Sequence, residues 1–244
     1  MAKARLLVTR FASHAQRLTD LLNEQGIYAV AQPLLEIKPV ENCLPPFTQH
    51  YDFIIAISCN AVEYTDVNLK GQGWPLSRYL AVGNASKSLL ESKVEQSVLM
   101  PITSYNSEGL LALPLLQQLP HCSVLILRGV GGREFLKDEL IKRGAKVDYY
   151  EPYQRVAIAL SRSMTVYKWQ QQKINGVIIT SIELLEQLIT ITDDDVWLKS
   201  LTLFTASERI LKYAQLLGFQ KTALLPSITN QKIIDFFINE GSYD

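Results

Sequence analysis

The feature that most constrains this fold is an internal repeat of a strand–helix–strand pattern. Residues 6–36, LLVTRFASHAQRLTDLLNEQGIYAVAQPLLE, align with residues 124–155, VLILRGVGGREFLKDELIKRGAKVDYYEPYQR. The pairs that share a separation of 118 residues are Arg10/Arg128, Leu18/Leu136, Leu22/Leu140 and Gly26/Gly144. After one extra residue in the second copy, Pro33 aligns with Pro152. Such self-similarity indicates two copies of one supersecondary arrangement.

Three further segments repeat in the same order along the chain. They are 53–64 with 176–187, 79–90 with 201–212, and 104–113 with 227–237. The strand segments are short and apolar at most positions, and helical patterns separate them. This arrangement is typical of parallel strands that crossover helices bury on both faces. The sequence therefore predicts two similar doubly wound α/β domains with ten strands in all.

Helix boundaries have chemical markers. TSIE (180–183) and TASE (205–208) fit the capping box, in which Thr180 or Thr205 caps the following helix. Gly26, Gly144 and Gly218 stand where the helices are expected to stop.

Composition excludes several classes of function. The 24 basic and 24 acidic residues balance, and no basic block is interleaved with aromatics, so we expect no nucleic-acid partner. The longest apolar runs, such as FIIAI (53–57), have the length of a strand, so no membrane association is expected. The N-terminal sequence lacks signal-peptide architecture, and we expect a cytoplasmic protein.

Cysteine and histidine usage argues against a metal site. Cys43, Cys59 and Cys122 are odd in number and far apart, which suggests neither a disulfide framework nor a zinc knuckle. The three histidines are equally scattered.

The glycine-rich turn RGVGGRE (128–134) resembles a cofactor loop but fails its tests. A dinucleotide fingerprint needs G-x-G-x-x-G, and Glu134 occupies the third glycine position. The first copy has RFASHAQ at this turn, without glycine. A turn that approaches an anionic ligand, through helix N–H groups and Arg128 or Arg133, is the better interpretation.

The motifs LLVTR, ISCNAV, AVGNAS, LILRGVGGREFLKDELIKRGAKV, YEPYQR and IITS together resemble the uroporphyrinogen-III synthase family, in its gammaproteobacterial type. The resemblance covers nearly the whole chain. It implies two flavodoxin-like parallel-sheet domains joined by a two-stranded linker. One domain would hold residues 1–37 plus 158–244, and the other residues 38–157. The repeat alone would place the boundary near residue 120.

The resemblance also implies a reaction. Family members cyclise the linear tetrapyrrole hydroxymethylbilane to uroporphyrinogen III, with loss of water and inversion of the last pyrrole ring, for haem and sirohaem synthesis. No cofactor or metal is needed, and a cleft between two hinged domains would hold the substrate. A monomer that receives its substrate from hydroxymethylbilane synthase is the expected arrangement.

Tyr153 matches a family tyrosine that faces the cleft, and its phenol could act on the departing hydroxyl as a general acid. The alternative is a linker tyrosine packed against a domain face. The expected substrate-binding residues lie at strand ends, helix starts or the glycine turn: Arg10, Ser58, Gly83, Asn84, Ser86, Arg128, Gly129, Arg133, Thr180, Ser181 and Ser207.

Structural roles compete with these assignments. Hydroxyls at helix starts commonly cap the helix, and Arg133 could pair with Glu134, Asp138 or another acid along its own helix. The sequence also departs from the family pattern, with Ile57 in place of a usual Thr and Thr205 in place of a usual Gly. Two other classes stay open: a non-enzymatic two-domain binder of small molecules, and a nucleotide-dependent enzyme.

Overall fold

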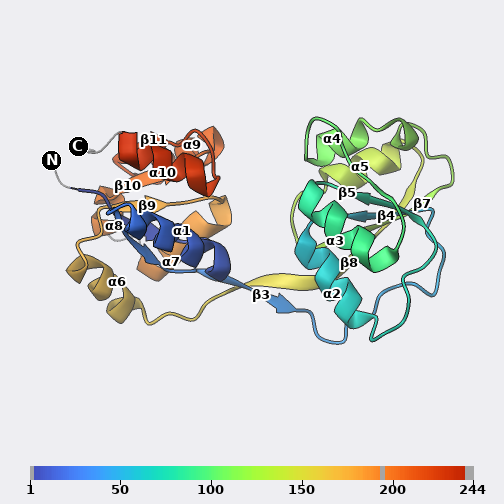
Figure 1. The fold of residues 1–244 in the computed structure, drawn as a ribbon, viewed down its shortest axis with the longest axis horizontal. Coiled ribbons are helices and arrows are strands. Elements are labelled where there is room, and N and C mark those ends of the chain that lie inside the picture. The colour runs from blue at the N-terminus through green and yellow to red at the C-terminus, as the bar shows by residue number, and fades with distance from the viewer. Residues whose placement is uncertain (1–2, 193–195, 240–244) are drawn as a thin grey trace. The chain divides into compact units, whose positions relative to one another are not determined.

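The computed structural model describes residues 3–192 and 196–239 (Figure 1). These residues form two compact units. Unit 1 contains the described residues up to Glu36 and those from Val156 onward, and unit 2 contains Ile37–Arg155. The chain thus leaves unit 1, completes unit 2 and returns.

Unit 1 is built on a five-stranded sheet. Its strands are β1 (Arg5–Val8), β2 (Tyr28–Ala31), β9 (Gly176–Ile178), β10 (Thr202–Thr205) and β11 (Lys221–Leu224). They lie in the order β11-β10-β9-β1-β2, and every neighbouring pair is parallel. This is the order of flavodoxin-like sheets, in which each crossover contains a helix.

Alternate residues of these strands face opposite helical layers. Leu6 and Val8 pack with helices α1 (Ala12–Glu24) and α10 (Asn230–Asn239). Leu7, between them, faces a core built largely from the second layer. That layer comprises α6 (Arg162–Gln171), α7 (Ile182–Thr192), α8 (Val196–Ser200) and α9 (Glu208–Leu216). Burial on both faces explains why the strands are continuously apolar.

Unit 2 is built on a six-stranded sheet in the order β3-β8-β7-β4-β5-β6. The strands are β3 (Leu35–Pro39), β4 (Phe53–Ala56), β5 (Arg78–Ala81), β6 (Val98–Leu99), β7 (Ser123–Gly129) and β8 (Lys146–Ala157). Helices α2 (Cys59–Asn68) and α3 (Asn84–Val94) cover one face, and α4 (Ser107–Leu111) and α5 (Phe135–Lys142) cover the other. A short 3-10 turn, Pro114–Leu116, follows α4.

The strands from β8 to β6 are parallel, whereas β3 runs antiparallel to β8. The N–H of Val40 donates to the carbonyl of Pro152 (2.9 Å), and the N–H of Ile158 donates to that of Leu34 (3.0 Å). Residue numbers rise along one strand while those of their partners on the other strand fall, so the two strands form an antiparallel ladder. Both passages of the chain between the units run through it.

The sequence repeat corresponds to a circular permutation. β7, β8, β4, β5 and β6 occupy the sheet positions in unit 2 that β1, β2, β9, β10 and β11 occupy in unit 1. The predicted α/β class with two parallel sheets is confirmed. Eleven strands rather than ten are present in the described residues, because β3 also pairs. β7 begins at Ser123 and lies between β8 and β4, so a boundary near residue 120 is excluded.

The helix stops follow the prediction, but the capping boxes do not. Gly26, Gly144 and Gly218 have φ of 73°, 96° and 92°, a conformation that favours glycine. At α7, Ser181 rather than Thr180 accepts the capping N–H, from Leu184 (3.2 Å). Thr205 is fully buried in β10, and no side chain caps α9. Both predicted capping boxes are therefore wrong.

No helix within residues 3–192 and 196–239 has the length and apolar character needed to cross a bilayer.

We predict that Gly144→Ala destabilises the protein by about 1–2 kcal/mol, because an L side chain at φ 96° is strained. Its Cβ would also stand 3.3 Å from Cα of Pro120. Urea unfolding measures the change. Gly73→Ala is the matched control, since its Cβ would meet nothing within 4 Å. Equal stability of the two variants would contradict this account.

Candidate functional site

The candidate residues gather where the parallel strands end. In unit 1, Arg10 follows β1, Thr180 and Ser181 follow β9, and Ser207 follows β10. In unit 2, Ser58 follows β4, Gly83 and Asn84 follow β5, and Arg128 and Gly129 form the end of β7. The carboxyl edge of an open parallel sheet is where such folds bind ligands. Each unit therefore has its own polar edge.

Tyr153 and Ser58 form a hydroxyl pair at the edge of unit 2. The Tyr153 side chain is 3% exposed, and its hydroxyl lies 3.0 Å from Oγ of Ser58. The ring stacks on Tyr64 with centroids 5.8 Å apart and planes at 26°. Ser58 Oγ also accepts the N–H of Ala61 (3.1 Å) and so caps α2. Tyr153 and Ser58 therefore each have a structural role and also carry a hydroxyl at the polar edge of unit 2.

Gly129 provides the space that Tyr153 occupies. A Cβ at Gly129 would lie 2.7 Å from Cε2 and Cζ of the Tyr153 ring. The strand register shifts between Leu127 and Gly129, and the N–H of Val130 donates to the carbonyl of Tyr153 (2.8 Å). The glycine is needed here because a ring packs directly on the backbone.

The polar residues at the turn after β5 differ in their exposure to solvent. Gly83 stands at the N-cap of α3 in extended conformation, and Asn84 is exposed. Ser86 is 7% exposed and lies 3.6 Å from the sulfur of Cys59, between α2 and α3. Gly83 and Asn84 are accessible to a ligand, whereas Ser86 is largely enclosed.

Arg128 is buried and neutralised within unit 2. Its guanidinium pairs with Glu151 and Glu134, each at 2.9 Å, and lies 3.5 Å above the ring of Tyr149. Burial lowers the pKa of Arg128, but hydrogen bonds to Glu134 and Glu151 outweigh burial and raise the pKa above its ordinary value. Glu151 also accepts the N–H of Gly131 (3.3 Å). Arg128 therefore holds the glycine turn against β8.

Arg133 is largely exposed and pairs with Glu108 of α4 at 3.2 Å. The alternative pairing with Glu134 or Asp138 is wrong, because Glu134 is engaged by Arg128 and by the hydroxyl of Tyr149 (2.9 Å).

Unit 1 has a pocket of about 570 Å³ at its carboxyl edge. Its lining residues are Arg10, Phe11, His14, Thr180, Ile228, Thr229 and Asn230. Arg10 is only 9% exposed, donates to Oδ1 of Asn230 (2.9 Å), and also donates to the carbonyl of Ile228. Burial lowers the pKa of Arg10. None of the described residues that line the pocket is acidic, so this lining is suited to an anion.

The other two hydroxyl residues at this edge, Ser181 and Ser207, differ in their hydrogen bonding. Ser181 caps α7 as described, and Ser207 stands at the N-cap of α9 without a side-chain capping bond. Sequence reasoning missed His14 and Asn230. The repeat of 104–113 in 227–237 carried the signal for Asn230, since it places the start of α10 at the same edge.

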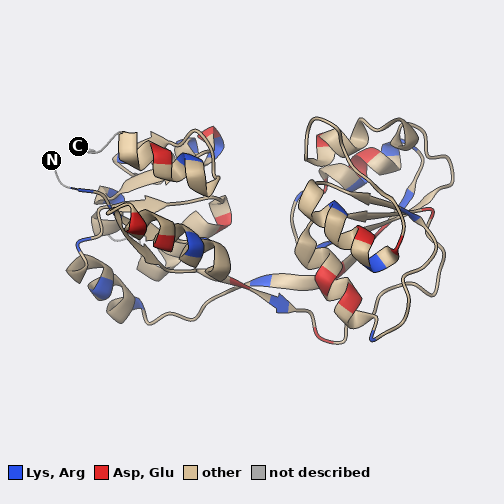
Figure 2. Cartoon of the chain, in the orientation of Figure 1, with Lys and Arg blue, Asp and Glu red and all other residues tan. Residues whose placement is uncertain are grey.

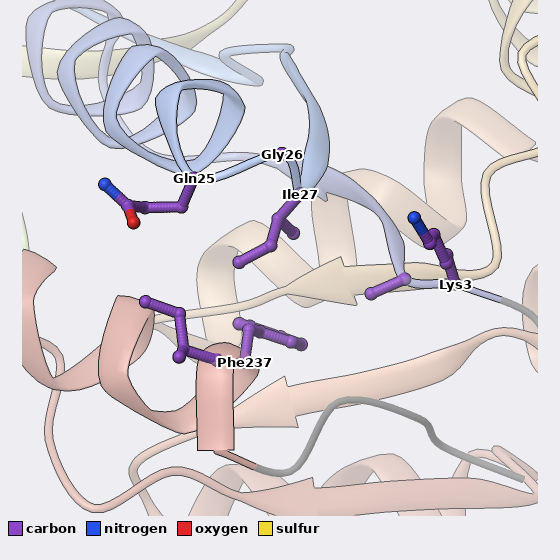
Figure 3. Close-up of a pocket in the computed structure, with 7 residues that line it drawn as sticks. Lys3, Gln25, Gly26, Ile27 and Phe237 are labelled. Atoms are coloured by element: carbon purple, nitrogen blue, oxygen red, sulfur yellow. The ribbon is translucent and has the colours of Figure 1, made fainter.

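A second pocket of about 270 Å³ lies at the opposite edge of this sheet (Figure 3). Lys3 and Ala4 precede β1, and Gln25, Gly26 and Ile27 form the turn after α1. Since this is the amino edge of the strands, we do not consider it a candidate site.

Basic and acidic residues are interspersed over both units (Figure 2). In the part of the chain that the structure describes, no group of three His, Cys, Asp or Glu side chains could hold a metal ion.

Fold and edges together define a two-unit, doubly wound α/β protein whose polar side chains gather at the ends of parallel strands. A family model described as uroporphyrinogen-III synthase HemD matches residues 16–235. Uroporphyrinogen-III synthase of Escherichia coli (strain K12) is 34% identical over 241 residues, covering 94% of this chain and 98% of the relative. The Salmonella typhimurium enzyme is 30% identical with the same coverage.

The chain therefore belongs to the uroporphyrinogen-III synthase family, and the predicted family is confirmed. It is a hydro-lyase of tetrapyrrole biosynthesis. Among solved structures, a mutant uroporphyrinogen III synthase from the extremely thermophilic bacterium Thermus thermophilus has a TM-score of 0.67 at 15% identity, covering 98% of this chain and 99% of the other. That similarity supports the fold.

We predict that Gly129→Ala displaces Tyr153, because overpacking against a buried ring costs about 1–3 kcal/mol. Thermal unfolding of the Gly129→Ala variant, compared with the wild-type protein, measures this loss of stability. In a Tyr153→Ala background the same substitution should cost much less, since the ring is absent. Additive losses would show that Gly129 does not act through Tyr153.

Proposed function

We propose that this enzyme cyclises hydroxymethylbilane to uroporphyrinogen III, with loss of the terminal hydroxyl as water and inversion of the last pyrrole. Family membership supports the reaction class. The observation that carries the proposal within this chain is the Ser58–Tyr153 hydroxyl pair at the carboxyl edge of unit 2.

The pair is suited to assist a departing hydroxyl. Ser58 Oγ already accepts the N–H of Ala61, and it can accept the Tyr153 O–H as well. The hydrogen of Ser58 is then free to point outward to the substrate. Donors in series polarise one another, and a phenol is a stronger acid than an aliphatic hydroxyl. Tyr153 thus supplies acidity, and Ser58 relays it to the surface of the unit.

The proton and electron balance is closed without a cofactor. The C–O bond breaks, its electron pair leaves with the oxygen, and a proton from the hydroxyl pair completes a water molecule. The electrophilic azafulvene is attacked by the substituted carbon of the last pyrrole, which gives a spiro intermediate. Rearrangement closes the ring with that pyrrole inverted, and loss of a proton restores aromaticity and the hydroxyl pair. The enzyme must fix one conformation and exclude water.

The eight carboxylates of the substrate need hydrogen-bond donors. We assign them to Arg10 and Thr180 in the unit 1 pocket, to Ser181 and Ser207, and to the accessible Gly83–Asn84 turn. Ser86, which is largely enclosed, lies behind that turn in α3. Arg133 is exposed and can exchange Glu108 for a substrate carboxylate. Arg128 and Gly129 support the glycine turn and Tyr153, and so act on the substrate indirectly.

We further propose that the enzyme is a cytoplasmic monomer that takes its substrate from the enzyme that makes hydroxymethylbilane. The three cysteines are free, as is usual in a reducing compartment.

We predict that the purified protein converts freshly generated hydroxymethylbilane to the type III isomer without added metal or cofactor. Chromatography of the oxidised products separates isomers I and III. Type I product alone, formed at the spontaneous rate, would refute the proposed function.

We predict that Tyr153→Phe lowers kcat about a hundredfold, the usual contribution of a general acid, while the fold is kept. Ser58→Ala should have a milder effect, because a water molecule can replace the relay hydroxyl. Steady-state kinetics and circular dichroism measure both. An unchanged rate in Tyr153→Phe would remove Tyr153 from the mechanism. Complete inactivity of folded Ser58→Ala would make Ser58 the essential donor.

A further inference from the structure

Three glutamates of unit 2 correspond to three glutamines of unit 1. The repeat aligns Glu134 with Gln16 at the separation of 118, and aligns Glu151 with Gln32 directly before the matched prolines. Helices α4 and α10, which correspond to each other, begin at Ser107 and Asn230, so Glu108 and Gln231 share the second helical position. Carboxylates at this edge are thus replaced by neutral amides in unit 1.

In unit 2 these glutamates neutralise the arginines of the edge. Glu134 and Glu151 pair with Arg128, and Glu108 pairs with Arg133. The buried charge of Arg128 is therefore satisfied within the unit, as buried cations require.

In unit 1 the corresponding Arg10 has neutral partners. Its guanidinium donates to the side-chain oxygen of Asn230 and to the carbonyl of Ile228. Gln16, at the position of Glu134, donates to Asp20 (2.7 Å) within α1 instead. Throughout residues 3–192 and 196–239, no carboxylate forms an ion pair with Arg10. A buried cation with only neutral partners is costly unless a ligand supplies the counter-charge.

The surroundings of Arg10 increase this positive potential. Helices α1 and α10 begin at the pocket, with Phe11 and Asn230 in its lining. No side chain caps α1. Unpaired N–H groups in the first turn of a helix favour an anion. The cavity of about 570 Å³ has room for a carboxylate side chain.

We propose that the Arg10 pocket is a subsite for a single carboxylate side chain, and that Asn230 is the specificity-determining residue that keeps the Arg10 charge available to it. The ligand's identity as a carboxylate of the tetrapyrrole rests on the proposed function. Asn230 fixes the guanidinium through a hydrogen bond without cancelling its charge. An aspartate would accept the same bond in the same place and form an internal ion pair.

The test is Asn230→Asp, which changes charge while preserving shape. We expect its KM for hydroxymethylbilane to rise about tenfold or more, the usual effect of losing a charged hydrogen bond, with little change in kcat. The melting temperature should stay equal or rise, because a buried pair is completed. Gln220→Glu adds the same charge at an exposed position of the opposite edge and should leave KM unchanged.

Asn230→Ala removes the hydrogen bond but keeps the charge, so its KM should rise less than that of Asn230→Asp. An unchanged KM in Asn230→Asp would overturn the proposal. The proposal would also be overturned if Asn230→Asp and Asn230→Ala showed the same rise in KM and both had a lower melting temperature. That pattern would indicate a structural role for Asn230.

Direct binding of uroporphyrin III, which has eight carboxylates, separates this proposal from the cyclisation. Fluorescence titration at constant salt should show weaker binding to Asn230→Asp and wild-type binding to Gln220→Glu. If the wild-type protein formed only isomer I yet showed this binding pattern, the proposed function would fail and the carboxylate subsite would stand. Equal binding to wild type and Asn230→Asp would refute the subsite.

Discussion

Parallel pairing of the strands is the constraint on which the rest of this structure depends. Where neighbouring strands run the same way, the connection between them must cross over through a helix, and both sheet faces become buried. The same pairing brings the carboxyl ends of distant segments to one edge. Arg10 and Thr180 are far apart in sequence yet line one pocket, since β1 and β9 are neighbours. Fold and site therefore follow from one hydrogen-bonding pattern.

The two units have the same arrangement of strands but divide their charges differently. Apart from β3, the first strand of unit 2 along the chain is β4, which holds the sheet position of β9, the third strand of unit 1. The corresponding edges are therefore reached by different loops. In unit 2, Arg128 is satisfied by Glu134 and Glu151 and holds the turn beside Tyr153. In unit 1, Arg10 has neutral partners. One arginine of the repeat thus holds a turn through two carboxylates, whereas the other donates hydrogen bonds to neutral oxygens.

Repetition and apolar periodicity were sufficient to predict the fold class, the helix stops and the edge positions of the candidate residues. They could not predict β3, whose pairing depends on a long-range ladder with β8. The capping boxes failed because cap identity depends on where a strand ends: Thr205 still belongs to β10, and Ser181 stands one residue nearer α7 than Thr180. The ion-pair partners of Arg128 and Arg133 could not be predicted from the sequence either, because several acidic residues were within reach of each arginine.

Tyr153 shows why packing and chemistry should not be treated as competing explanations. Its ring fills the core beside Tyr64, and the absence of a side chain at Gly129 lets it lie against the backbone. These contacts restrict the ring to one orientation, and Ser58 bonds its hydroxyl there. A donor held by a packed core needs little reorganisation when charge develops on a departing group, which is how fixed dipoles contribute to catalysis. The burial that first suggests a structural tyrosine is therefore what would make its hydroxyl effective.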